Sequence, residues 1–215
     1  MSGAMVLQNR VDPFGVLIAT SARGLFFGNR GGRFHRDDQT LGRRRWASRQ
    51  WICCVLQFKQ RHRAVWGHGY TELFFLDEVT ALGAGHRPCF ECRRADAKAF
   101  AAKWAHATAG EIPHAPDMDL VLQAERLHGR AKRTQETPID DLPDGTFVTL
   151  KSVPNVAYAI RGSRLLRWSE SGYSEKKLRP RQTAMNVLTP PSIVAILRAG
   201  YRPQWHPSAG PGVNS

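Results

Sequence analysis

The sequence has few acidic residues. It carries 18 Asp and Glu against 31 Lys and Arg in 215 residues, which gives a formal net charge of +13 with neutral histidines. Such an excess of positive charge favours a polyanionic partner, because each phosphate that a cation neutralises releases counterions. We therefore expect the protein to bind nucleic acid. The alternatives are an anionic small molecule or protein as the partner, and a generally basic protein without a charged partner.

Long apolar runs are also absent. No stretch approaches the roughly 18 apolar residues that mark a membrane span. The start of the chain lacks the basic residues followed by an apolar core that are typical of a secretion signal. With 42% hydrophobic and 23% charged residues, the composition is that of a folded globular protein. We expect a soluble, cytoplasmic protein that does not bind membranes.

Cysteine is scarce. The chain has four, Cys53, Cys54, Cys89 and Cys92, and in a reducing cytoplasm metal binding or catalysis is a better expectation than disulfides. The pair Cys89 and Cys92 forms a C-x-x-C knuckle directly before a predicted helix. Thiolates at such a turn are preferred zinc ligands, and a helix N-terminus lowers the pKa of thiols. The alternatives are a redox-active pair, around which no βαβ pattern is present, and an incidental pair of core cysteines. The sequence therefore predicts zinc.

One knuckle supplies only two of four zinc ligands. Cys53 and Cys54 are the next donors, but neighbours on a strand point to opposite faces, so we expect one of them to reach the metal and prefer Cys54. If three cysteines bind, the fourth position is open, as in catalytic zinc sites, or is filled by a histidine. The H-x-E motif of zinc nucleobase deaminases is missing upstream. The histidines considered are His35, His62, His68 and His86.

Hydrophobic patterning predicts an α+β fold in two parts. A zinc-stapled hairpin and helix domain extends to about residue 135, and a small β-rich module covers 140–215. The strands expected in the first part are a hairpin over 15–28, a second hairpin over 51–66, and a short strand at 71–75. The expected helices cover 78–82, 91–106 and 118–133, with a further short helix at 192–200. From Tyr201 onward we expect a loose tail.

A basic segment without acidic residues runs from Arg43 to Arg63. Its arginines can clamp phosphates, and the interleaved Trp46, Trp51 and Trp66 can either stack on bases or fill the core. Two further arginines follow the knuckle directly. The predicted nucleic-acid-binding residues are Arg43, Arg44, Arg45, Arg49, Arg61, Arg63, Arg93 and Arg94.

Candidate catalytic residues outside the cysteines are few. His35 is followed by Asp37 and Asp38, and a histidine with carboxylates can gather around a metal ion or a scissile phosphate. Glu72 is a candidate general base. Asp77 is expected to cap the helix that begins at residue 78. A metal-dependent nuclease or hydrolase that uses His35, with the cysteines only stapling the fold, is therefore an alternative function.

The run EVTALGAGHRPCFEC, residues 78–92, resembles the second half of the zinc domain of the Ada DNA-repair protein. The resemblance covers about residues 50–95 and implies a four-cysteine zinc site, with Cys53 and Cys54 in the place of the upstream pair. It also implies that one thiolate, here Cys54, accepts a methyl group from a DNA phosphotriester. Ada-type domains separate the upstream cysteines by three residues, whereas here they are adjacent, so we favour a structural zinc.

The expected function is a zinc-containing nucleic-acid-binding protein of DNA repair or modification. A non-enzymatic DNA-binding regulator is a further alternative, and whether the protein is an enzyme stays open.

Overall fold

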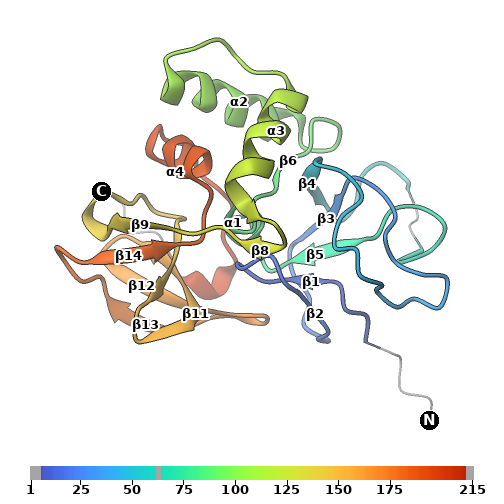
Figure 1. Cartoon of the computed structure of the whole chain (residues 1–215), viewed down its shortest axis with the longest axis horizontal. Helices are drawn as coiled ribbons and strands as arrows, with labels where there is room; N and C mark the ends of the chain where they lie inside the picture. Colours follow the sequence, from blue (N-terminus) through green and yellow to red (C-terminus); the bar gives the residue numbers. More distant parts are fainter. Residues whose placement is uncertain (1–5, 62–63, 212–215) are drawn as a thin grey trace.

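The computed structural model describes residues 6–61 and 64–211. Two six-stranded sheets lie next to each other, and three of the helices pack together on one side of them (Figure 1). The α+β class predicted from the sequence is confirmed. None of the helices in the described part of the chain combines the length and apolar character needed to cross a membrane.

The first sheet has the strand order β2-β1-β5-β3-β4-β6. Strand β3 pairs antiparallel with β4 and β5, and β4 pairs in parallel with the two-residue strand β6. The bounds are β1 Arg10–Val11, β2 Leu17–Ile18, β3 Phe26–Arg30, β4 Trp51–Val55, β5 Leu73–Phe75 and β6 Arg87–Pro88.

The predicted hairpins over 15–28 and 51–66 are wrong. The strand at residues 17–18 pairs with β1, and β3 takes its partners from β4 and β5. Strand β4 likewise pairs with β3 and β6, which are distant along the chain. The apolar runs mark strands at 17–18, 26–30 and 51–55, whereas residues 64–66 form none. Their partners were set by packing of the whole sheet rather than by the nearest turn.

Helix α1, Glu78–Gly83, lies between the two sheets and is buried along its whole length. Its N-cap is Asp77, as predicted, whose Oδ1 accepts a hydrogen bond of 2.8 Å from the backbone N–H of Thr80. Gly83 allows close packing, since a Cβ there would lie 2.5 Å from the ring of Phe147 in the second sheet. The apolar core is thus continuous from α1 into that sheet.

Three longer helices form a second core on one side of the sheets, filled by Phe100, Trp104, Leu122 and Ile196. They are α2 Arg94–Thr108, α3 Ala115–Arg126 and α4 Pro191–Arg198. The helix predicted over 118–133 ends early, at Arg126. The chain continues into a small hairpin of β7, Leu127–His128, and β8, Ala131–Lys132, which turns at Gly129 with φ +62°.

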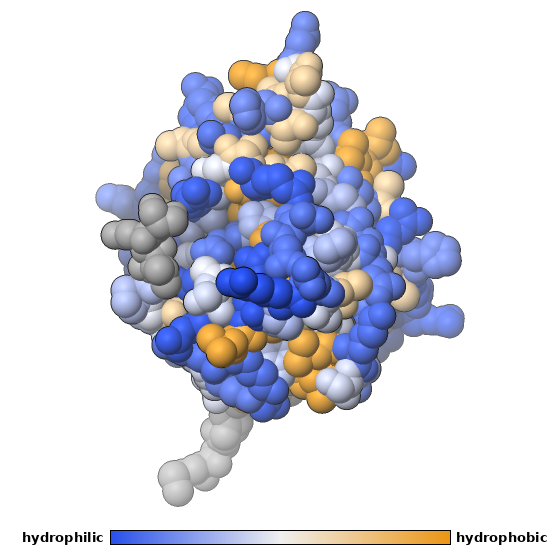
Figure 2. Space-filling model, turned by 90° about the vertical axis from the view of Figure 1, so that its left-hand side faces the viewer, coloured by the Kyte–Doolittle hydropathy of each residue, from blue (hydrophilic) through white to orange (hydrophobic). Residues whose placement is uncertain are grey.

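The second sheet is antiparallel, with the order β13-β12-β11-β10-β14-β9. The face of the molecule on this side is mainly hydrophilic, and its apolar side chains form small separate patches (Figure 2). The bounds are β9 Gln135–Pro138, β10 Phe147–Leu150, β11 Val153–Arg161, β12 Arg164–Ser169, β13 Gly172–Leu178 and β14 Ala184–Val187.

The expected loose tail is instead ordered over residues 201–211 and returns to α1. The hydroxyl of Tyr201 donates a 2.6 Å hydrogen bond to Glu78, whose other oxygen accepts from the N–H of Gln204 at 2.9 Å. The N–H of His206 donates to Asp77 at 3.0 Å. Two buried carboxylates therefore find their partners in the tail, which removes the cost of burying them unpaired.

Candidate functional site

Three cysteines gather at one end of the first sheet. In the parallel pair of β4 and β6, Cys53 lies opposite Pro88, so the next residues are brought side by side: Cys54, still in β4, and Cys89, directly after β6. Cys92 follows one turn later, just before α2. The Sγ atoms of Cys54, Cys89 and Cys92 all lie within 4.8 Å of one another, and these three residues, here called the cysteine cluster, can hold a metal ion.

The thiols of the cluster are electrostatically linked. Hydrogen bonds from Cys54 and Cys92 lower the pKa of Cys89, and the N–H of Glu91 lies 3.4 Å from the Cys89 sulfur. The bond to Cys89 raises the pKa of Cys54 in turn. Without a cation the cluster therefore favours one thiolate and two thiols. A divalent metal removes that limit, because it stabilises several thiolates at once.

Cys53 is not part of the cluster, which corrects the four-cysteine ligand set. Its side chain points to the opposite face of β4, is fully buried, and packs with Phe26 and Leu73. The nearest cation is Arg93, whose Nη1 lies 3.4 Å from the Cys53 sulfur. The alternation of side chains along a strand explains why only one of two adjacent cysteines reaches the metal position.

Arg93 does not serve as a surface arginine, although we predicted that it binds nucleic acid. It is buried and forms ion pairs with Glu78 at 2.8 Å and with Asp96 at 2.7 Å. It fixes the start of α2 against α1. Arg94 and Arg61 are exposed, and Arg61 forms an ion pair with Glu91 inside the knuckle. Arg63 lies outside the described residues.

Among the described residues, no histidine joins the cysteine cluster. His86 is fully buried between Trp51 and Phe75, and its Nε2 accepts a hydrogen bond from Arg30 at 3.2 Å. Burial and the charge of Arg30 lower its pKa, so its ring is neutral. His68 is exposed. His62 lies outside the described residues.

His35 occupies a structural position. It is buried, it stacks on Trp66 with ring centroids 5.3 Å apart, and both ring nitrogens have partners, Thr71 and the carbonyl of Gly67, at 2.9 Å. The carboxylates that we expected beside it point elsewhere. Asp37 pairs with Arg33, and Asp38 caps the turn at Thr40. The predicted metal or phosphate site around His35 is therefore not formed.

Glu72 is also structural. It is buried, and its carboxylate accepts a 2.7 Å hydrogen bond from the N–H of Trp66. The Trp66 indole donates to the Glu72 carbonyl at 3.0 Å. These bonds close the loop between residues 66 and 72. Glu72 is not among the residues that gather at the cysteine cluster, and it holds this loop instead of serving there as a general base.

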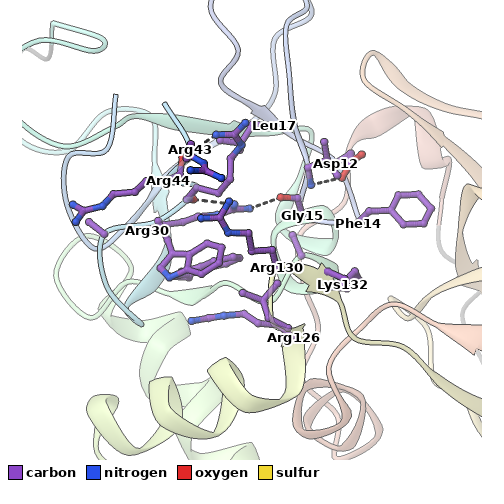
Figure 3. A pocket seen from close by; sticks show the side chains of 18 of the residues that line it. Asp12, Phe14, Gly15, Leu17, Arg30, Arg43, Arg44, Arg126, Arg130 and Lys132 are labelled. Carbon is purple, nitrogen blue, oxygen red and sulfur yellow. Dashed lines mark hydrogen bonds between the residues drawn. The ribbon is translucent and has the colours of Figure 1, made fainter. Parts of the chain in front are cut away.

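Three of the predicted phosphate-binding arginines line one cavity of about 730 Å³, here called the arginine cavity (Figure 3). It lies where the first sheet meets the end of α3 and the β7–β8 hairpin. Seven cationic side chains line it, from segments far apart in the sequence. They are Arg30, Arg43, Arg44, Arg45, Arg126, Arg130 and Lys132.

The floor of the cavity holds two buried guanidinium groups. Arg30 and Arg126 are 1% and 0% exposed, and both stack on Trp51. Arg30 also donates to the carbonyl of Gly15 at 2.9 Å, and Arg126 to that of Gly85 at 2.9 Å. Gly85 has φ +86°, and a Cβ there would lie 2.8 Å from the Arg126 side chain, so glycine permits this approach.

The cations of the cavity outnumber its carboxylates. None of its seven cations forms an ion pair with a carboxylate of the described residues. Asp12 is the one carboxylate among the described lining residues. The buried Nε of Arg126 has no hydrogen-bond partner. Unpaired buried charge is costly, and an anionic ligand would compensate it.

Two lining residues that sequence reasoning missed have shifted pKa values. Burial raises the pKa of Asp12 to about 6 and lowers that of Lys132 to about 7. Lys132 donates a 2.6 Å hydrogen bond to the carbonyl of Gly83. No local motif marks these residues or Arg30 and Arg126, because each is an ordinary charged residue in its own segment.

No protein-family model, curated protein or solved structure matches this chain. The functional conclusions therefore depend on the chemistry of the cysteine cluster and of the arginine cavity.

Proposed function

We propose that the protein is a zinc-containing nucleic-acid-binding protein, with the arginine cavity as its phosphate-binding site. The observation that carries this proposal is the convergence of seven cations and one carboxylate on a single cavity. Guanidinium groups bind phosphate bidentately, and several of them in one place give the salt-dependent affinity typical of nucleic-acid binding. The net charge of +13 supports the same conclusion.

Zinc is the metal proposed for the cysteine cluster. A tetrahedral Zn²⁺ with Zn–S bonds of about 2.3 Å separates its sulfur ligands by about 3.8 Å. Sulfur atoms already within 4.8 Å of one another need only a small adjustment to reach that spacing. Thiolates are soft ligands, which disfavours magnesium or calcium. The ion would tie the end of β4 to the start of α2.

A structural role for zinc is supported better than a methyl-acceptor role. Cys54, the residue that the resemblance to the Ada zinc domain implies as acceptor, is only 4% exposed. Cys89 is 7% exposed, and only Cys92 is half-buried. A thiolate must reach a phosphotriester methyl group directly, and burial prevents Cys54 from doing so. The resemblance still supports DNA as the nucleic acid and repair or modification as the process.

Strand β4 connects the cysteine cluster to the arginine cavity. Trp51, under the two buried arginines, begins β4, and Cys54 lies three residues later in that strand. A metal that holds Cys54 to the knuckle would restrain the strand that carries the cavity floor. Pre-ordering of buried arginines lowers the entropy lost when phosphate binds.

The test is a titration of fluorescently labelled single-stranded and duplex DNA and RNA with the metal-loaded protein between 50 and 200 mM salt, conditions over which phosphate contacts change affinity strongly. We expect the logarithm of the binding constant to fall linearly with the logarithm of the salt concentration. A protein that binds none of these at the lowest salt contradicts the proposal.

A further inference from the structure

The charges of the arginine cavity are graded with depth. Arg43, Arg44 and Arg130 are exposed, whereas Arg30 and Arg126 are fully buried. A ligand that enters the cavity therefore contacts exposed guanidinium groups and comes closer to the charge of the buried ones. Coulomb attraction grows along this path, because the effective dielectric constant falls with burial. The gradient favours a ligand that carries concentrated negative charge at one end.

The size of the cavity selects against a duplex. Its volume of about 730 Å³ is within the range of sites that enclose a small molecule, roughly 300–1,000 Å³. One or two nucleotides fit into such a volume. The phosphates of a duplex lie along the outside of a wide helix, so a duplex could contact the exposed rim but could not enter the cavity. An unpaired nucleotide is the unit of nucleic acid that can enter.

Aromatic rings are also present, and one of them is available. Trp51 is buried, and its ring is already stacked with two guanidinium groups, at 3.8 and 4.0 Å from its centroid. Trp46 lines the same cavity, is half-buried, and contacts Trp51 in a tilted arrangement. A base can stack on the free part of the Trp46 ring, as bases do on aromatic residues of single-strand-binding proteins.

We propose that the arginine cavity binds the phosphorylated terminal nucleotide of a single strand, with its phosphate at the exposed Arg43, Arg44 and Arg130, above the buried charge of Arg30 and Arg126, and its base against Trp46. This inference rests on the proposed nucleic-acid binding. A terminal phosphate carries a charge of about −1.5 to −2 at pH 7, whereas an internal phosphodiester carries one negative charge. A terminal phosphate is therefore the part of a strand that a dense cation cluster prefers.

The experiment compares strands that differ only at their ends. The full metal-loaded chain is mixed with a labelled single-stranded DNA, and the label is displaced by unlabelled strands of the same sequence with a 5′-phosphate, a 3′-phosphate or two hydroxyl ends. We expect one of the phosphorylated strands to compete at least tenfold better than the hydroxyl strand. Equal competition by all three overturns the inference.

Competition by free ligands shows whether the cavity recognises the end of a strand, a nucleotide or only a phosphate group. A nucleoside monophosphate should displace the labelled strand, and inorganic phosphate should do so more weakly, because it lacks a base. If phosphate competes as well as the nucleotide, the cavity is an anion site only, and the nucleotide inference fails. If the free nucleotide competes but terminal phosphorylation of a strand has no effect, the strand-end inference fails.

Trp46 gives a matched pair of variants. Trp46→Ala should lower nucleotide affinity about tenfold while leaving the affinity for inorganic phosphate unchanged, and Trp46→Phe should restore most of the loss. An equal loss for both ligands contradicts base stacking. Arg130→Gln, at an exposed position, is a second variant that lowers the preference for a terminal phosphate.

The outcomes distinguish this inference from the proposed function. If single strands bind with strong salt dependence but without preference for a terminal phosphate, nucleic-acid binding stands and the terminal-nucleotide site does not. If no strand binds at any salt concentration, both are overturned.

Discussion

The guanidinium carbon of Arg30 lies 3.8 Å from the centroid of the Trp51 ring, at the floor of a cavity that six further cations line. The indole face stabilises this buried cation in part, since cation–π attraction strengthens when the pair is desolvated. It adds no negative charge. The remaining positive potential is therefore available to an anion. The same strand carries Cys54, which connects the cavity floor to the cysteine cluster.

Metal content should depend on three of the four cysteines. We expect one zinc ion per chain in the native protein, and its loss in Cys89→Ser together with a fall of several kcal/mol in the free energy of unfolding. Cys53→Ser is the matched control for metal content alone, because Cys53 points away from the cluster but is buried in the core. Elemental analysis and thermal unfolding check both. Zinc retained in Cys89→Ser but lost in Cys53→Ser would refute the assigned ligands.

Anion binding should weaken as pH rises from 5 to 8. Asp12, with a pKa of about 6, gains its negative charge in this range, and Lys132, with a pKa of about 7, loses its positive charge. Both changes disfavour an anion. Sulfate is the suitable probe, because it stays a dianion throughout, and calorimetry measures its affinity.

The variant Asp12→Asn should bind sulfate more tightly at pH 7 and lose the lower part of this pH dependence. The amide can still accept the hydrogen bond that the Val16 N–H donates to Asp12 at 2.8 Å, so the local turn is kept. A wild-type affinity that does not change over the range contradicts this reading of the two groups.

Gly83→Ala should destabilise the protein by about 1–3 kcal/mol, although alanine normally favours a helix. The reason is the added Cβ, which would lie 2.5 Å from the Phe147 ring where α1 meets the second sheet. Gly69→Ala is the control, because a Cβ there meets nothing within 4 Å. Denaturant unfolding of both variants measures the difference, and equal stabilities would contradict this packing.

Local signals predicted the local features of this fold. The C-x-x-C knuckle, the Asp77 cap and the helix after Pro190 each depend on residues within a few positions of one another. The pairing of strands could not be predicted from neighbouring residues. For example, β3 and β4 are joined by a long segment and are aligned only by the sheet that they share. The order of the tail could not be predicted either. Its hydrogen-bond partners are the carboxylates of Asp77 and Glu78, which lie more than a hundred residues earlier in the sequence.

The residues of the candidate site also fall into two groups, those that a local sequence pattern predicts and those that only tertiary packing brings together. The sequence identified Arg43, Arg44 and Arg45 as a run of charge, and the structure places them on the arginine cavity. Arg30 and Arg126 could not be found, because burial of a lone arginine is decided by tertiary packing around Trp51 and Gly85. For Arg93 the sequence predicted exposure, and the structure shows burial. It is adjacent to exposed cations in sequence, but Glu78 and Asp96 bury it as an ion-paired group.

The most direct test of the central claim compares two double variants in salt-dependent DNA binding. Arg43→Gln with Arg44→Gln removes two exposed cations of the cavity, and Arg94→Gln with Lys98→Gln removes two exposed cations of α2. We predict that the cavity variant reduces the slope of log affinity against log salt by about 2, whereas the α2 variant leaves it unchanged. An unchanged slope in the cavity variant, with the loss in the α2 variant, would contradict the account.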